Sequence, residues 1–207
     1  MRTVTLATQK GGSGKSTLAA CLAVAAHGDG LRTAVLDSDP QGSLDKWANR
    51  RDAEAPHVEK CEPHELDAKI KALRKLGFGL CLIDTAGVQN TAVVPAIQVA
   101  DLCLVPVKPT LTDLEAAVPT AKQLRDRKKQ FAFVMSQCFG NANRLNDVAA
   151  ALLKHGEVAP ANVFQRVDYP DALTGGLGVT EYNPSGAAAK EVRLLWAWLR
   201  RVIGEQE

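Results

Sequence analysis

The sequence has 207 residues, of which 46% are hydrophobic and 23% are charged, and its formal net charge is +2. These values exclude a disordered or fibrous chain and suit a single α/β domain over residues 1–207. The small net charge means that any contact with nucleic acid needs a local basic patch. The sequence shows no apolar leader and no stretch of about 18 apolar residues, so we expect a cytoplasmic protein.

Short apolar runs typical of strands alternate along the chain with segments of helical periodicity. The predicted strands cover 4–7, 33–36, 80–83, 102–107, 131–135 and 163–167. The predicted helices cover 15–26, 44–51, 65–76, 91–99, 111–127, 144–155 and 185–203. This alternation predicts a mostly parallel central sheet flanked by helices on both faces. Functional residues are therefore expected just after the strands.

A glycine-rich turn follows the first predicted strand and leads into an alanine-rich helix. It reads Gln9-Lys10-Gly11-Gly12-Ser13-Gly14-Lys15-Ser16-Thr17. Inward-pointing backbone N–H groups and the helix N-terminus would make it a nest for phosphate oxygens, as in a P-loop NTPase-type fold. Lys15 would then bridge the β- and γ-phosphates, Ser16 would bind Mg²⁺, and Thr17 would reach the α-phosphate. The common pattern has glycine in place of Gln9, and Lys10 is an additional lysine.

Carboxylates follow the next two predicted strands. Asp37 and Asp39 come after the second strand, and their spacing points both side chains the same way. Asp84 ends the third strand in "LCLIDTAG", the Walker B arrangement in which a carboxylate holds Mg²⁺, usually through water. Residues 85–87 would form a switch that senses a γ-phosphate. Together with the phosphate loop, these residues predict a site for ATP and Mg²⁺.

These motifs resemble those of the ParA/MinD group of deviant Walker A ATPases. Residues 10–16 match the group's K-G-G-x-G-K-[ST] loop, and "LDSDPQGS" looks like its second motif. "LVPVKPTLTDLEA" is similar to the segment near the nucleotide base in ParA-type proteins, which implies base contacts at Pro106 and Pro109. "SGAAAKEVRLLWAWL" resembles the closing helix. The chain departs from many relatives at Ser136-Gln137, where they have an asparagine that reads adenine.

The resemblance implies a mechanism that depends on an ATP-bound homodimer. Lys10 would cross the interface to the phosphates of the ATP bound by the other subunit and act as an arginine finger does. Asp39 would orient or deprotonate the attacking water, and Asp37 would assist the Mg²⁺ shell. Hydrolysis would be slow and stimulated by a partner, so the protein would act as a nucleotide-timed switch.

The resemblance to short ParA-type partition ATPases also implies a cargo. The ATP dimer would bind DNA without sequence preference, associate with the nucleoid and be released by a ParB-like or other stimulating partner. The expected DNA-binding residues are Arg125, Arg127, Lys128 and Lys129, supported by Arg144, Arg166, Arg200 and Arg201. A basic run at the end of a helix can equally be a solvated face that complements the helix dipole.

Three other functions remain as alternatives. A MinD-like membrane-cycling ATPase that positions a protein assembly would use the apolar face of the closing helix, although that face also suits packing on the sheet. An iron–sulfur ATPase would need cysteines in loops, whereas Cys81 and Cys103 lie in predicted strands. An ATP-dependent amidase or ligase would need a glutamine-amide site, which the sequence does not visibly supply. We expect the five cysteines to be buried thiols.

Overall fold

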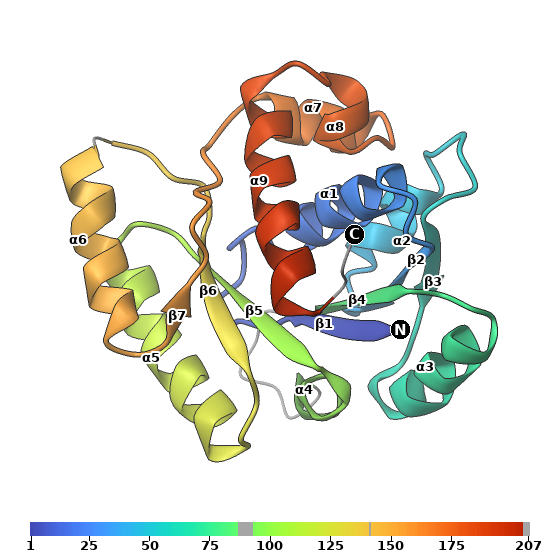
Figure 1. Cartoon of the computed structure of the whole chain (residues 1–207), viewed down its shortest axis with the longest axis horizontal. Coiled ribbons are helices and arrows are strands. Elements are labelled where there is room, and N and C mark those ends of the chain that lie inside the picture. Colours follow the sequence, from blue (N-terminus) through green and yellow to red (C-terminus); the bar gives the residue numbers. More distant parts are fainter. Residues whose placement is uncertain (87–92, 141, 205–207) are drawn as a thin grey trace.

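A computed structural model describes residues 1–86, 93–140 and 142–204 of the chain. One fully parallel sheet of seven strands, in the order β3-β2-β4-β1-β5-β6-β7, forms its centre (Figure 1). The strands are β1 Arg2–Leu6, β2 Thr33–Ser38, β3 His57–Lys60, β4 Leu80–Thr85, β5 Leu102–Val107, β6 Phe131–Met135 and β7 Glu157–Val158. The predicted parallel α/β fold is therefore confirmed.

Helices cover both faces of the sheet (Figure 1). The first face carries α1 Lys15–Gly28, α2 Ser43–Ala48, α7 Asp168–Thr174, α8 Val179–Tyr182 and α9 Ala187–Val202. The second face carries α3 Leu66–Lys75, preceded by the 3₁₀ turn η1 Pro63–Glu65, with α4 Val93–Val99, α5 Leu111–Asp126 and α6 Ala142–Leu153. The inner strands β2, β4, β1, β5 and β6 are buried on both sides, apart from Arg2 at the start of β1, because each side packs against helices.

The differences from the predicted elements lie at the sheet edges and near the C-terminus. β3 and β7 were not predicted, because they are short edge strands without a continuous apolar run. The strand predicted over 163–167 is wrong. Only a single parallel bridge, between Cys138 and Phe164, forms there. The short helices α7 and α8 follow where no element was predicted. Residues 91–92 of the predicted fourth helix lie outside the described residues.

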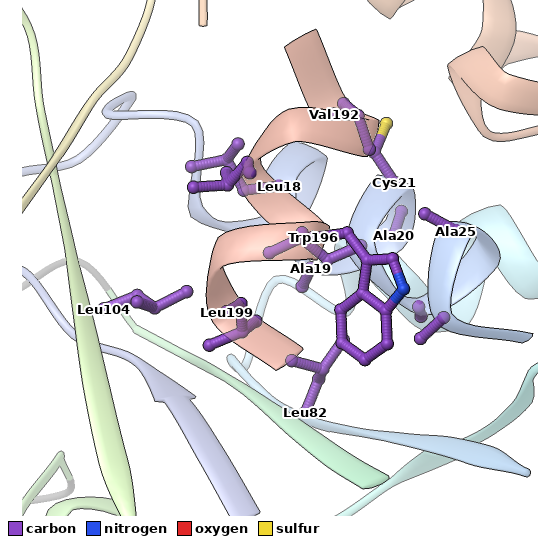
Figure 2. Close-up of a cluster of buried hydrophobic side chains, with 14 of the residues drawn as sticks. Leu18, Ala19, Ala20, Cys21, Ala25, Leu82, Leu104, Val192, Trp196 and Leu199 are labelled. Atoms are coloured by element: carbon purple, nitrogen blue, oxygen red, sulfur yellow. The ribbon is translucent and has the colours of Figure 1, made fainter. Parts of the chain in front are cut away.

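The closing helix α9 packs its apolar face into the protein. Val192, Trp196 and Leu199 point toward α1 and the sheet, and Leu18 and Cys21 meet them from α1 (Figure 2). All five side chains are at most 2% exposed. The apolar face that the membrane alternative requires is therefore part of the core. Among the described residues, the helices are too short or too polar to cross a membrane.

Replacing Trp196 with alanine should strongly destabilise the chain. The indole is 2% exposed and its Nε1 donates to Asp29 Oδ2 at 2.6 Å, so the change leaves a cavity and removes this hydrogen bond. We expect a loss of about 3–5 kcal/mol in the free energy of unfolding, measured by urea denaturation. The control is Leu194→Ala on the same helix, 64% exposed, for which the change should be about 0.5 kcal/mol or less. Equal losses for the two variants would show that α9 is not packed as described.

The cysteines are free and buried, as predicted. Burial raises the pKa of Cys21, Cys81, Cys103 and Cys138 to about 12 and that of Cys61 to about 11. Buried neutral thiols are neither good nucleophiles nor good metal ligands. Within the described residues, no group of three or more cysteine, histidine or acidic side chains is arranged to hold a metal ion.

Candidate phosphate and nucleoside site

The phosphate loop connects the end of β1 to the start of α1. Gly12 and Gly14 have φ values of +71° and +90°, a backbone conformation that residues with a Cβ rarely adopt. Two side chains that follow β6 hold the loop from outside. Ser136 Oγ donates to Ser13 O, and Gln137 Nε2 donates to Gly12 O, both at 2.8 Å. The Ser136-Gln137 pair that departs from many relatives therefore supports the phosphate loop here.

A cavity of about 780 Å³ lies against this loop. Its lining includes the predicted phosphate-binding residues Gly11, Gly12, Ser13, Gly14, Lys15, Ser16 and Thr17. Asp39 and α2 form the opposite wall. The first turn of α1 directs its unpaired N–H groups into this space, which favours an anion. The cavity therefore joins the glycine-rich turn and the Asp39 segment that the sequence separates.

Lys15 is a buried cation at the start of α1. Its side chain is only 6% exposed. Burial lowers the pKa of Lys15, and the nearby carboxylates of Asp84 and Asp39 act in the opposite direction. A buried ammonium group without a bound anion is costly, so phosphate oxygens would relieve its desolvation.

Ser16 and Asp84 form the part of the site that suits Mg²⁺. Ser16 Oγ donates to Asp84 Oδ2 at 2.5 Å, while Asp84 Oδ1 is buried without a hydrogen-bond partner. Burial raises the pKa of Asp84 to about 7, partly opposed by the hydrogen bond from Ser16, and neighbouring Asp37 raises it further. A hydroxyl beside a carboxylate with an unused oxygen is an arrangement of hard oxygen donors that Mg²⁺ favours. The residues present thus fit the predicted ion.

The two carboxylates after β2 have different environments. Asp37 is fully buried, and its oxygens accept from the backbone N–H groups of Asp39, Leu44 and Asp45 at 3.1, 2.8 and 3.0 Å. The carboxylate therefore caps the start of α2. Its predicted role of assisting the Mg²⁺ shell stays a prediction. Asp39 is half-buried and lines the cavity. Its position is compatible with the predicted catalytic role, and Asp37 fixes the backbone that carries it.

Lys10 lies outside the lining of the phosphate cavity of its own subunit. Its Nζ donates to Asp113 Oδ2 at 2.8 Å and to Thr112 Oγ1 at 3.2 Å, at the N-terminus of α5. The Lys10 side chain is 39% exposed, whereas that of Asp113 is 6% exposed. The additional lysine is therefore held at the molecular surface, available to a neighbouring molecule if the ion pair with Asp113 opens.

A second cavity of about 380 Å³ adjoins the first at Gly14 and Thr17. Its other walls are Ser136, Gln137 and the segment 163–170. The sequence pattern predicted a strand over 163–167 and gave no nucleotide contact to this segment. Arg166 was expected only to support DNA binding. Pro106 and Pro109, predicted to lie near the base, are buried and line neither cavity. The geometry therefore favours segment 163–170 for nucleoside contacts, and it does not support the two prolines.

Two of the four residues predicted to bind DNA are engaged within the protein. Arg125 Nη1 donates to His155 O at 2.6 Å, and Lys129 Nζ donates to Gln98 O and Ala100 O at 2.6 and 3.0 Å. Both cations thus satisfy backbone carbonyls at the ends of helices. Arg127 and Lys128 are exposed. Of the supporting arginines, Arg144 lies over Phe139, Arg166 pairs with Glu191, and Arg200 lies 3.9 Å from Asp29.

Comparison with known families identifies the family of this chain. The model of the CobQ/CobB/MinD/ParA nucleotide binding domain matches residues 4–179. The chain belongs to this family. Protein IncC of Escherichia coli is 28% identical over 249 aligned positions, covering 94% of this chain and 68% of IncC. Protein ParA of Rhizobium radiobacter is 27% identical, covering 82% of this chain and 81% of that protein.

Solved structures agree with this fold. MinD of Pyrococcus horikoshii, determined in complex with Mg-ADP, superposes with a TM-score of 0.79 at 17% identity, over 98% of this chain and 97% of that one. As a member of the CobQ/CobB/MinD/ParA family, the chain has a nucleotide-binding domain that contains the phosphate loop, Asp39 and Asp84. Helix α9 follows the residues matched by the family model but shares a core with α1.

Proposed function

We propose that the protein is a ParA-type ATPase that hydrolyses ATP and positions a DNA or protein cargo. The observation that carries this proposal is the cavity that the phosphate loop and Asp39 both line, where Ser16 in the lining is hydrogen-bonded to Asp84 behind it. The similarity to IncC and ParA supports a partition function. Slow hydrolysis and stimulation by a ParB-like or other partner protein belong to the same proposal.

The residues divide the chemistry of ATP hydrolysis between them. The N–H groups of the loop and Lys15 would bind the phosphates and stabilise the charge that develops on the γ-phosphoryl group. Ser16 and Asp84 would hold Mg²⁺, which supplies further neutralisation of phosphate charge when it is bound. Asp39 would orient the attacking water. The segment 163–170 would enclose the nucleoside in the second cavity, next to Thr17.

The position of Lys10 supports a homodimer formed on ATP binding. In the described chain its ammonium group faces α5 and not the phosphate cavity of its own subunit. A lysine held at the rim can reach the phosphates of a second subunit that approaches face to face. ATP bound between two subunits would then stabilise the dimer, and hydrolysis would release it.

We also propose that the ATP-bound form binds DNA without sequence preference, and the first test should use a variant that binds ATP but does not hydrolyse it. The Asp39→Ala variant should bind random-sequence duplex DNA in the presence of ATP·Mg²⁺ but not in the presence of ADP. Its affinity for DNA should fall as the salt concentration rises. Fluorescence anisotropy at low and moderate salt would measure this. Absence of DNA binding with either nucleotide would contradict the DNA proposal but not the ATPase proposal.

The same assay can test whether Arg127 and Lys128 contact DNA, with Arg125 and Lys129, which hydrogen-bond backbone carbonyls, as the comparison. Lys128 has a φ of +56°, so Asn, which tolerates this conformation, is the suitable replacement. Arg127→Gln with Lys128→Asn should weaken binding and reduce the salt slope by about 1 for each lost phosphate contact. Arg125→Gln with Lys129→Gln should instead lower the melting temperature. An unchanged salt slope in the first double variant would exclude this patch.

A further inference from the structure

One buried carboxylate, Glu191 on α9, is not part of the phosphate site. The residue is 9% exposed and lies beyond the region matched by the family model. Its oxygens accept three hydrogen bonds from one short segment, and they form an ion pair with Arg166. The donors are Phe164 N at 3.1 Å, Arg166 Nε at 2.7 Å and the Tyr169 hydroxyl at 3.1 Å, and Arg166 Nη2 lies 2.6 Å from Glu191 Oε1. A single side chain of the closing helix thus fastens the segment 164–169.

The segment that Glu191 fastens is a wall of the second cavity. Phe164, Arg166 and Tyr169 all line this cavity, opposite Gly14 and Thr17 of the phosphate loop. The wall is also attached elsewhere. Backbone hydrogen bonds join Val163 and Gln165 to the end of β6, and Asn183 Nδ2 donates to Asp168 Oδ2 at 3.3 Å. Glu191 is the side chain of α9 that hydrogen-bonds Arg166 and Tyr169 in this wall.

The contacts of Arg166 and Tyr169 with Glu191 all depend on one carboxylate. Hydrogen bonds to a charged group are about twice as strong as those between neutral groups. The pKa of Arg166 is raised by its hydrogen bond to Glu191, and the pKa of Tyr169 is raised by burial and by the Glu191 charge. Removing the carboxylate would leave the guanidinium and the buried hydroxyl without their acceptor. The wall would then lose the hydrogen bonds that join it to α9, while the phosphate loop would keep those from Ser136 and Gln137.

We propose that Glu191 is a positioning residue for the nucleoside half of the nucleotide, acting through Arg166 and Tyr169 on the wall of the second cavity. The inference rests on the proposed function, because it assumes that the phosphates occupy the first cavity. The proposal divides nucleotide binding into two contributions. The loop holds the triphosphate, and α9 holds the wall that encloses the nucleoside.

Competition between ATP and inorganic tripolyphosphate tests this separation, because tripolyphosphate has no nucleoside. Dissociation constants of both, with Mg²⁺, would be measured by displacement of a fluorescent ATP analogue from the full chain. Glu191→Gln should raise the dissociation constant of ATP at least fivefold and leave that of tripolyphosphate within twofold of the wild type. Arg166→Gln should give a smaller shift in the same direction, and the double variant should be no weaker than Glu191→Gln alone.

Two further variants keep the test decisive. Glu157→Gln removes the same charge from an exposed position on β7 and should change neither constant. Tyr169→Phe removes one of the three hydrogen bonds to Glu191. If Glu191→Gln does not fold, this variant should still weaken the binding of ATP, and not that of tripolyphosphate, by about twofold. Parallel loss of ATP and tripolyphosphate affinity, or no loss of either, would overturn the role of Glu191. A wild-type chain that binds neither compound would overturn the proposed function as well.

Discussion

Lys15→Ala should abolish ATP hydrolysis and nucleotide binding together. The lysine is the buried cation of the phosphate cavity, 6% exposed, and Asp84 and Asp39 lie close enough to influence its pKa. Without it the cavity would lose its buried cation, and the negative charge of Asp39 beside the loop would no longer be opposed there. We expect the hydrolysis rate to fall by about a hundredfold or more. The stabilisation of the chain by ATP in a thermal melt should disappear at the same time.

The matched control for this prediction is Lys46→Ala. Lys46 lines the same cavity but is exposed, and its Nζ donates to Gln41 O at 2.9 Å. A charge of the same sign is thus removed from the same cavity, away from the first turn of α1. The control should keep nucleotide binding within about fivefold of the wild type, since an exposed charge contributes about 1 kcal/mol or less. Nucleotide binding that survives in Lys15→Ala would contradict the assignment of the phosphate site.

Lys10→Ala should separate nucleotide binding from hydrolysis. Because Lys10 does not line the cavity of its own subunit, one chain should still bind ATP with nearly wild-type affinity. In the proposed dimer, hydrolysis requires a cation that the second subunit delivers. Loss of the Lys10 ammonium group should therefore lower the hydrolysis rate about a hundredfold to a thousandfold. Phosphate release measured over a range of protein concentrations would show this. The wild-type rate per subunit should rise with concentration, and the variant rate should stay low throughout.

Asp113→Asn is the control that distinguishes action in trans from a structural role. It breaks the same ion pair but leaves the lysine in place. If Lys10 only supported the fold through Asp113, the two variants would lose hydrolysis equally. If Lys10 acts on the phosphates of the partner, Asp113→Asn should stay within about fivefold of the wild-type rate, the usual range for one partly exposed ion pair. Hydrolysis at the wild-type rate in Lys10→Ala would exclude the proposed role of this lysine.

Local sequence patterns identified most of the elements that build the site. Strands β5 and β6 have the predicted bounds, and α1 begins at the predicted Lys15. These elements were predictable because strands buried on both faces are continuously apolar, and because glycines with positive φ mark the phosphate loop. The edge strands β3 and β7 were not predictable in this way, because one side of each lacks a neighbouring strand and their residues are partly exposed.

The sequence alone determined the parallel α/β class and the glycine-rich turn that lines the first cavity, because both depend on patterns within a few neighbouring residues. The tertiary structure decided which distant groups meet. It placed Lys10 on Asp113, turned Arg125 and Lys129 toward helix ends, and joined Glu191 to the segment 164–169. Each of these contacts joins residues on different elements, and only the order of strands and the packing of helices on the sheet bring such residues within hydrogen-bonding distance.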